Sequence, residues 1–296
     1  MVEHELAVVP MNMTGMIRQK QHDYYFLRLK AVAGDLTATQ MACIALVAER
    51  YGRGAVHLST RQGIEIHHVH HDNLESARRV LEVSGIQMGA SGNTVRVIVA
   101  CPGEATCKWG VMDTKKIAKE LDRRFFNQEA PSKFKMAVTG CANNCTKANE
   151  NDIGVRGALE PEWVSTSCCD CQLCVKLCPA KAIERRESGS NGTRAFSYTI
   201  DRDRCINCSI CTQHCSGEAW VVGRKGYTLF IGGTMGKVPR FATVLKHMIQ
   251  SEEELYDLIQ KALTCHRKHG KKKERFGHMI DRIGIEQVRA EILGST

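Results

Sequence analysis

Two runs of four cysteines constrain this chain more than any other feature of its sequence. In each run, two residues separate the first, second and third cysteines, and three residues separate the third from the fourth. The runs are Cys168, Cys171, Cys174, Cys178 and Cys205, Cys208, Cys211, Cys215. Such tight spacing lets a short loop wrap an iron–sulfur cubane, with the metal doing part of the work of a core. The sequence therefore predicts a loop-rich, metal-organised module within 160–223.

This spacing is that of bacterial-type ferredoxins with two [4Fe-4S] clusters, in which the fourth cysteine of each run ligates the other cluster. It predicts one cluster on Cys168, Cys171, Cys174 and Cys215, and a second on Cys205, Cys208, Cys211 and Cys178. Cys169, beside the first ligand, leaves a shifted register open. Zinc is the alternative metal, although zinc sites favour two C-x2-C pairs separated by a longer stretch. A polar turn between two short strand patterns at 184–200 completes the module.

Composition and charge bear on partners and location. The formal net charge is +9, but clusters held by four thiolates and an acidic cofactor would offset it, so we expect no nucleic-acid partner. No apolar run reaches the ~18 residues of a membrane span. The first fifteen residues lack the basic and apolar regions of a secretory signal. We therefore expect a cytoplasmic protein whose fifteen cysteines are not paired in disulfides.

The rest of the chain predicts an α+β fold. Residues 23–85 follow the order strand, helix, strand, strand, helix, which is a ferredoxin-like arrangement. Residues 94–158 place strand patterns before two cysteine-containing loops, with a helix at 114–125 between them. Helices are also expected at 241–251, 252–269 and 283–293. The module at 160–223 thus interrupts a larger domain, as loop tips tolerate.

A third set of four cysteines is divided between those two loops. Cys101 and Cys107 follow the strand pattern at 94–100, and Cys141 and Cys145 follow the one at 133–140. Because both pairs follow strands, two adjacent strand ends could bring four thiolates around one cubane. From the residues alone, a zinc site or unconnected core cysteines are also possible.

The segments CPGEATC and CANNC resemble the siroheme–[4Fe-4S] signature of sulfite and nitrite reductases, and the resemblance extends through STRQG, PSKFK and the GG after the insertion. The order of the cysteine sets is most similar to the siroheme subunit of anaerobic, dissimilatory-type sulfite reductases. The resemblance implies a third [4Fe-4S] cluster on Cys101, Cys107, Cys141 and Cys145, with Cys145 bridging to siroheme iron. It also implies a ferredoxin-like half domain at 1–88, a siroheme and [4Fe-4S] domain at 89–159 and 224–296, and an inserted two-cluster ferredoxin domain at 160–223.

The resemblance further assigns roles to five basic residues, any of which would alone be read as a solvated surface charge. Sulfite and nitrite are anions whose oxygens leave as water, which requires proton donors and fixed positive charge. Arg96, Lys133 and Lys135 match substrate-binding positions. Arg61 matches an arginine that contacts siroheme carboxylates, which suit its planar fork. Lys30 stands where the family has an arginine, and offers a point charge in place of that fork.

The implied function is the six-electron reduction of sulfite to sulfide, with electrons supplied by an external ferredoxin- or flavoprotein-type donor through the [4Fe-4S] clusters. Nitrite reduction to ammonia at the same centre is one alternative, and a non-catalytic iron–sulfur and siroheme electron-transfer subunit is another. The chain has one of the two related halves that build the family's active region, so we expect a homo-oligomer. The histidines within 67–71, Cys43 and Cys265 are expected to be surface or structural residues.

Overall fold

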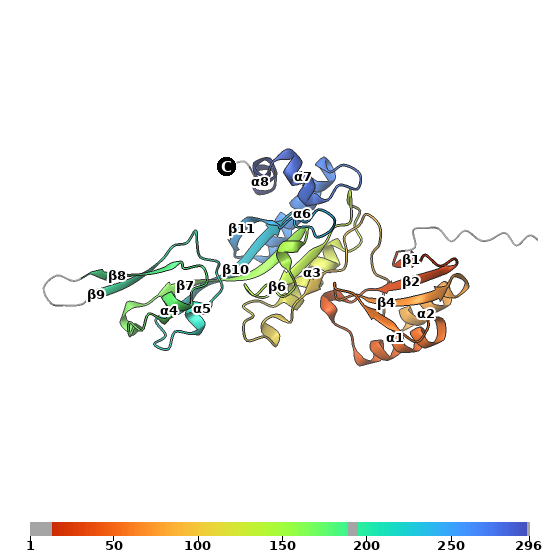
Figure 1. The fold of residues 1–296 in the computed structure, drawn as a ribbon, viewed down its shortest axis with the longest axis horizontal. Coiled ribbons are helices and arrows are strands. Elements are labelled where there is room, and N and C mark those ends of the chain that lie inside the picture. The colour runs from red at the N-terminus through yellow and green to blue at the C-terminus, as the bar shows by residue number, and fades with distance from the viewer. Residues whose placement is uncertain (1–13, 189–194, 295–296) are drawn as a thin grey trace, which may run out of the picture.

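The structure is a computed structural model that describes residues 14–188 and 195–294. Figure 1 shows an N-terminal sheet with two helices, a central sheet beside it, and a smaller module at the far end. Most of residues 1–15, on which the expectation about a secretory signal rested, and the predicted turn at 189–194 lie outside the described residues. No helix in the described ranges has the length and apolar character needed to cross a bilayer.

The N-terminal sheet is antiparallel and has four strands. In spatial order they are β1 (Met16–Arg18), β2 (Tyr24–Leu29), β4 (Ile64–His70) and β3 (Val56–Leu58). Two helices, α1 (Ala38–Tyr51) and α2 (Leu74–Val83), pack their apolar residues against the strands in one core. A capping box between Thr37 and Gln40 fixes the start of α1. The predicted order of strands and helices is confirmed, with β1 as an additional strand.

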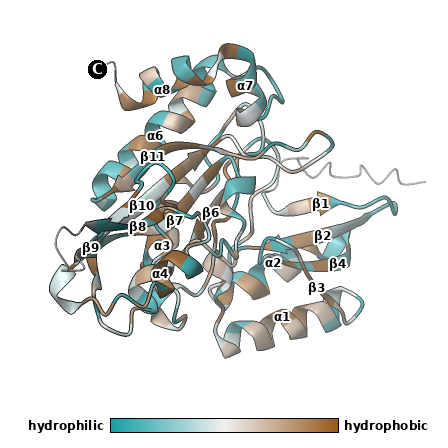
Figure 2. Ribbon diagram, turned by 60° about the vertical axis from the view of Figure 1, so that its left-hand side comes forward, coloured by the Kyte–Doolittle hydropathy of each residue, from teal (hydrophilic) through white to brown (hydrophobic). Residues whose placement is uncertain are grey.

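The central sheet has five strands and mixes both directions. In spatial order they are β11 (Thr243–Ile249), β10 (Trp220–Ile231), β7 (Ile153–Trp163), β6 (Met136–Thr139) and β5 (Val99–Ala100). The strands β5, β6 and β7 are parallel, whereas β7, β10 and β11 are antiparallel. The largest core packs this sheet against the helices α3 (Thr114–Phe125), α6 (Glu252–His269), α7 (Phe276–Ile283) and α8 (Ile285–Leu293). Figure 2 shows hydrophobic residues concentrated on the central strands.

The predicted helix at 241–251 is wrong, because this segment forms β11. Its residues pair with β10, for example Val244 with Phe230, and Leu245 and Ile249 are buried. The unpaired edge of β10 offers a row of backbone hydrogen-bonding groups, which a strand can satisfy and a helix cannot. The β-branched residues Thr243 and Val244 also favour the strand. The helix predicted at 252–269 coincides with α6, and α8 lies within the one predicted at 283–293.

The module between β7 and β10 grows out of the central sheet. The two strands pair from Ile153 with Ile231 as far as Trp163 with Trp220, and the intervening residues form the module. It contains α4 (Leu173–Leu177), the hairpin β8 (Ile183–Ser188) and β9 (Ala195–Ile200), and α5 (Ile210–Gln213). Its small core packs Ile183, Tyr198 and Trp220 with five of the cysteines. Most of the apolar surface of a normal core is missing here, as expected of a metal-organised module.

Candidate functional site

The loop between β3 and β4 fastens the N-terminal sheet to the central one. The Gln62 side chain donates a hydrogen bond to the carbonyl oxygen of Ala100 (2.8 Å) and accepts one from its N–H (3.0 Å). Gln62 thereby pairs with the last residue of β5 much as a neighbouring strand would. Because Cys101 follows directly, this contact holds the loop next to the first cysteine pair.

Arg61, on the same loop, spans the junction between the sheets. Its guanidinium donates to the carbonyl oxygens of Val97 (3.2 Å) and Met136 (3.1 Å) and to the Asn151 side chain (2.5 Å). Burial lowers the pKa of Arg61 to about 10, although the nearby Asp152 carboxylate opposes the shift. A guanidinium with a pKa of about 10 remains charged at neutral pH, so Arg61 supplies a fixed positive charge.

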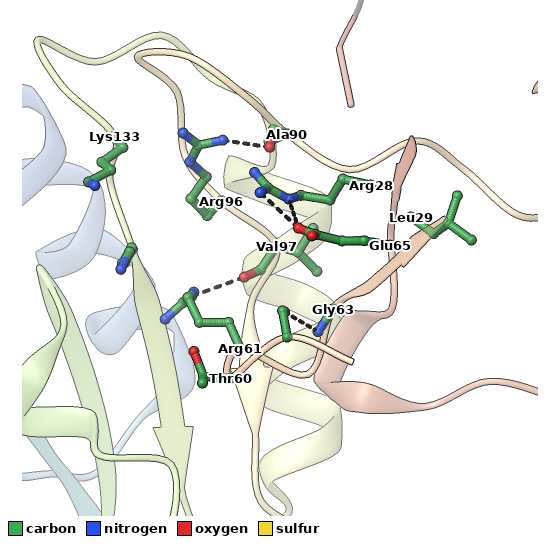
Figure 3. Close-up of a pocket in the computed structure, with 12 residues that line it drawn as sticks. Arg28, Leu29, Thr60, Arg61, Gly63, Glu65, Ala90, Arg96, Val97 and Lys133 are labelled. Carbon is green, nitrogen blue, oxygen red and sulfur yellow. Dashed lines mark hydrogen bonds and ion pairs between the residues drawn. The ribbon is translucent and has the colours of Figure 1, made fainter. Parts of the chain in front are cut away.

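A hollow of about 310 Å³ opens beside Arg61. Five basic side chains from four segments of the chain line it: Arg28, Arg61, Arg96, Lys133 and Lys135. Figure 3 shows four of them around one opening. The hollow also contains one buried carboxylate, Glu65, to which Arg28 donates from Nε (2.9 Å) and Nη2 (2.8 Å). Positive charge therefore exceeds negative charge at this opening.

Arg96 is held in place by the loop that precedes it. Its two terminal nitrogens donate to the carbonyl oxygens of Ala90 (2.5 Å) and Gly92 (2.8 Å). Burial, assisted by the charges of Arg28 and Arg275, lowers the pKa of Arg96 to about 10. The side chain is thus oriented by neutral backbone groups, which leave its charge without a carboxylate to neutralise it.

The two lysines of the hollow also lack acidic partners. Within the described residues, neither Lys133 nor Lys135 forms an ion pair with a carboxylate. Burial, followed by the charges of Arg61, Arg275 and Lys133, lowers the pKa of Lys135 to about 8. Its backbone N–H donates to the buried Asp152 carboxylate (2.8 Å), which also binds Arg275 (2.5 Å). An anion in the hollow would relieve this repulsion.

Lys30 lies outside this cluster. Its ammonium is 2.7 Å from the Asp122 carboxylate and 3.9 Å from the centre of the Phe126 ring, both against α3. The strand β2 ends at Leu29, and the chain then turns through a 3-10 segment in which Ala33 has a φ of 57°. The structure therefore places Arg28, which the sequence analysis did not single out, at the hollow in place of Lys30.

A second hollow of about 250 Å³ adjoins the first and leads to Cys145. The two share Thr60, Arg61 and Lys135 as lining residues. The Cys145 side chain is exposed and lines the second hollow. The basic cluster and this thiol thus border one continuous depression.

The four cysteines of the divided set meet at the ends of β5 and β6. Burial raises the pKa of the Cys141 thiol, and the nearby Cys101, Cys107 and Cys145 thiolates add to this effect. The N–H of Gly140 donates to the Cys101 sulfur (3.1 Å). Grouped thiolates with an N–H donor are the ligand environment of a [4Fe-4S] cluster.

The two cysteine runs of the module have the same backbone conformation. Each contains three non-glycine residues with left-handed φ values at matching positions: Asp170 and Asn207, Gln172 and Ser209, Lys181 and Glu218. Each fourth cysteine accepts an N–H hydrogen bond four residues on, from Ala182 to Cys178 and from Ala219 to Cys215, both at 3.2 Å. Two equivalent loops of this kind suit two equivalent metal centres.

The ligands from the two runs mix as the spacing predicts. Cys178 from the first run lines a small cavity together with Cys205, Cys208 and Cys211 from the second. Burial raises the pKa of Cys208, with added effects from Cys178 and Cys205. In the other group, burial raises the pKa of Cys174, with added effects from Cys168 and Cys171.

A third hollow borders the other two. It has a volume of about 420 Å³ and is lined by Lys133, Lys237, Lys273, Arg275 and His278, among other residues. The buried Nε2 of His278 has no hydrogen-bond partner within the described residues. The unpaired cations and this orphaned nitrogen fit a large acidic ligand, and the carboxylates of siroheme meet that description. The donor set is therefore compatible with siroheme next to Cys145.

The remaining candidate ligands have ordinary environments. Within the described ranges, the one group of three possible ligand atoms within 4.8 Å of one another is Cys265, His269 and Glu291. The Glu291 carboxylate there already pairs with His269 (2.7 Å) and Lys268 (3.2 Å). Cys43 donates to the carbonyl oxygen of Val80 and packs against the N-terminal core.

Comparisons with known proteins cover nearly the whole chain. The model of the nitrite and sulphite reductase 4Fe-4S domain matches residues 91–295, and that of the nitrite/sulfite reductase ferredoxin-like half domain matches 17–83. The coenzyme F420-dependent sulfite reductase of Methanocaldococcus jannaschii is 29% identical over 94% of this chain but only 44% of that protein. One subunit of the anaerobic sulfite reductase of Salmonella typhimurium is 26% identical over 53% of this chain and 50% of its own. Among solved structures, dissimilatory sulfite reductase I has a TM-score of 0.73 at 20% identity, over 92% of this chain and 69% of that one, which is a likeness of fold.

Proposed function

Because this chain belongs to the nitrite and sulfite reductase family, we propose that it reduces sulfite to sulfide at a siroheme coupled to a [4Fe-4S] cluster. The observation that carries the proposal is the shared border of two features. A hollow with surplus positive charge, from Arg96, Lys133 and Lys135, adjoins the exposed sulfur of Cys145 through Arg61. Anion binding and metal binding would therefore occur side by side.

In this proposal, Cys101, Cys107, Cys141 and Cys145 hold the cluster, and the Cys145 sulfur is also the ligand that faces siroheme. Arg61 and the basic residues of the third hollow bind the siroheme carboxylates. When bound, the two groups supply the electrons and the bond-breaking chemistry, while the protein supplies position and charge.

The basic residues of the first hollow have separate tasks. Arg28 and Arg96 keep a fixed positive charge that attracts and orients the anion. Lys135 has a pKa of about 8 and can therefore release a proton near neutral pH, as a general acid must. The oxygens of sulfite leave as water and need such a donor. Lys133, which is exposed, can recruit the replacement proton from solvent.

The module between β7 and β10 is proposed to be a two-cluster ferredoxin domain that feeds the catalytic cluster one electron at a time. Its two cysteine loops with matching backbones support this interpretation. An external ferredoxin- or flavoprotein-type donor would reduce it. We also propose a homo-oligomer, which size-exclusion chromatography with light scattering would test.

The test is turnover by protein purified without oxygen. We expect about twelve cluster irons in three [4Fe-4S] clusters, one siroheme, and sulfide release from sulfite with reduced methyl viologen as donor. Ammonia from nitrite at higher kcat/KM than sulfide from sulfite would support the second candidate, nitrite reduction, which the family description also covers. A fully loaded protein that reduces neither anion would refute both and leave an electron-transfer subunit.

A further inference from the structure

The strand β7 connects the two regions where cysteines gather. Arg156 is in register with Thr139 of β6, and the chain after Thr139 leads directly to Cys141. Three residues further along β7, Leu159 forms a parallel bridge with Cys208 of the module. The Arg156 side chain therefore originates between one ligand of the divided set and one ligand of the second run.

The charge of Arg156 is buried without a carboxylate. Its Nη2 donates to the carbonyl oxygen of Ile206 (3.3 Å), and its guanidinium lies 5.0 Å from the centre of the Phe230 ring. The buried Nε has no hydrogen-bond partner, and no ion pair forms at this side chain within the described residues. Burying a lone charge is costly, so the folded chain needs negative charge nearby that acidic side chains do not supply.

The two cysteine groups are the source of that negative charge. Burial lowers the pKa of Arg156, while the thiolates of Cys208 and then Cys141 act in the opposite direction. One thiolate of each group is thus within electrostatic reach of the same guanidinium. The cysteines at 168, 171 and 174 are not among its charged neighbours.

We propose that Arg156 is a positioning residue for electron transfer between two [4Fe-4S] clusters. One is held by Cys178, Cys205, Cys208 and Cys211, and the other by Cys101, Cys107, Cys141 and Cys145. This inference rests on the proposed function for the identity of the metal groups. It assigns to Arg156 the fixed positive charge that both clusters share.

The physical effect follows from charge. Each step moves one electron, so the accepting cluster gains one negative charge and the donating cluster loses one; no atom or proton is transferred. A nearby positive charge favours the reduced form of a cluster and raises its reduction potential. The electron originates from a low-potential one-electron donor outside the chain.

The order of the clusters follows from exposure. Cys171 is exposed, so the cluster on Cys168, Cys171, Cys174 and Cys215 is the outer one and meets the external donor. The cluster that includes Cys208 is the inner one. A second contact between the module and the catalytic loop, Trp109 against His214 at 5.9 Å between ring centroids, fixes the same docking without a permanent charge.

The experiment is an EPR-monitored redox titration of the loaded protein without sulfite or nitrite. In R156Q, which keeps length and a hydrogen-bond donor but loses the charge, we expect full iron and siroheme content. The inner and catalytic clusters are expected to move to lower potential, by about 59 mV if the equilibrium constant changes tenfold, while the outer cluster stays unchanged. R79Q, an equal charge change on the exposed face of α2, is the matched control and is expected to match the wild type.

The conservative variant R156K retains the charge and is expected to keep wild-type potentials. If R156Q loses iron, R156K decides alone: full iron with wild-type potentials supports the proposal, and full iron with lowered potentials overturns it. Unchanged potentials in fully loaded R156Q also overturn it. Because no substrate is present, a wild-type protein that turns over neither anion refutes the proposed function and leaves this titration to judge Arg156.

Discussion

Lys135 makes the pH dependence of the proposed reaction testable. Burial and the neighbouring charges of Arg61, Arg275 and Lys133 lower its pKa from 10.5 to about 8. An arginine at the same position stays protonated over the whole working range. We therefore expect the wild type to lose activity as the pH rises through 8, and K135R to keep its activity there.

The size of the effect follows from the pKa. About nine tenths of Lys135 is charged at pH 7 and about one tenth at pH 9, so kcat/KM should fall about tenfold between them. The sign for stability is the reverse. Between pH 8 and 10.5 the unfolded chain retains a proton that the folded chain has lost, so the free energy of unfolding of the metal-free protein rises with pH in this window.

The assay is sulfite reduction at subsaturating substrate with reduced methyl viologen, from about pH 7 to pH 9. Sulfite itself titrates near neutrality, so the informative quantity is the ratio of K135R to wild-type kcat/KM at each pH. This ratio should rise about tenfold. K135M, which has no charge at any pH, should give a rate at least about tenfold below wild type at pH 7. A flat K135R ratio would refute the assignment of Lys135.

Three further variants test other parts of the site. C145S should lose about four of about twelve cluster irons together with the siroheme absorption bands; an unchanged iron content would contradict the ligand assignment. K30M leaves the Asp122 carboxylate buried and unpaired, so denaturant titration should show a loss of about 3–5 kcal/mol with kcat/KM nearly unchanged. Reduced kcat/KM at full stability would instead return Lys30 to the anion site. In G157A the new Cβ would lie 2.5 Å from the Gly140 carbonyl oxygen, so Tm and catalytic-cluster iron should both fall, and wild-type values for both would show that this contact can relax.

Local signals in the sequence predicted the parts of the fold that depend on local chemistry. The helix expected at 114–125 is α3 residue for residue, because its apolar periodicity and the Asp113 side chain, which accepts from the N–H of Lys116, both act within a few residues. The cysteine runs behave likewise, since their spacing determines the loop around each metal centre. Motif resemblance extended this to Arg61, Arg96, Lys133 and Lys135, which the structure places around one hollow.

Features that depend on distant partners could not be read locally. Arg28 and Lys30 are two residues apart, and simple alternation would place them on the same face; the end of β2 at Leu29 separates them. Arg275 reaches the site through Asp152, 123 residues away in the chain, and no motif marks it. The segment that forms β11 is a strand because the edge of β10 is available to it, which is a property of the assembled sheet.

The pairing of β7 with β10 has a mechanical consequence. The ladder continues from the central sheet to the base of the cluster module, with one irregularity near Gly223. Electron carriers tethered by flexible linkers must search for their docking position before each transfer, whereas here the carrier is built onto a stiff two-stranded arm. Raising solvent viscosity should therefore slow the encounter with the external donor and leave the passage of electrons inside the chain unchanged.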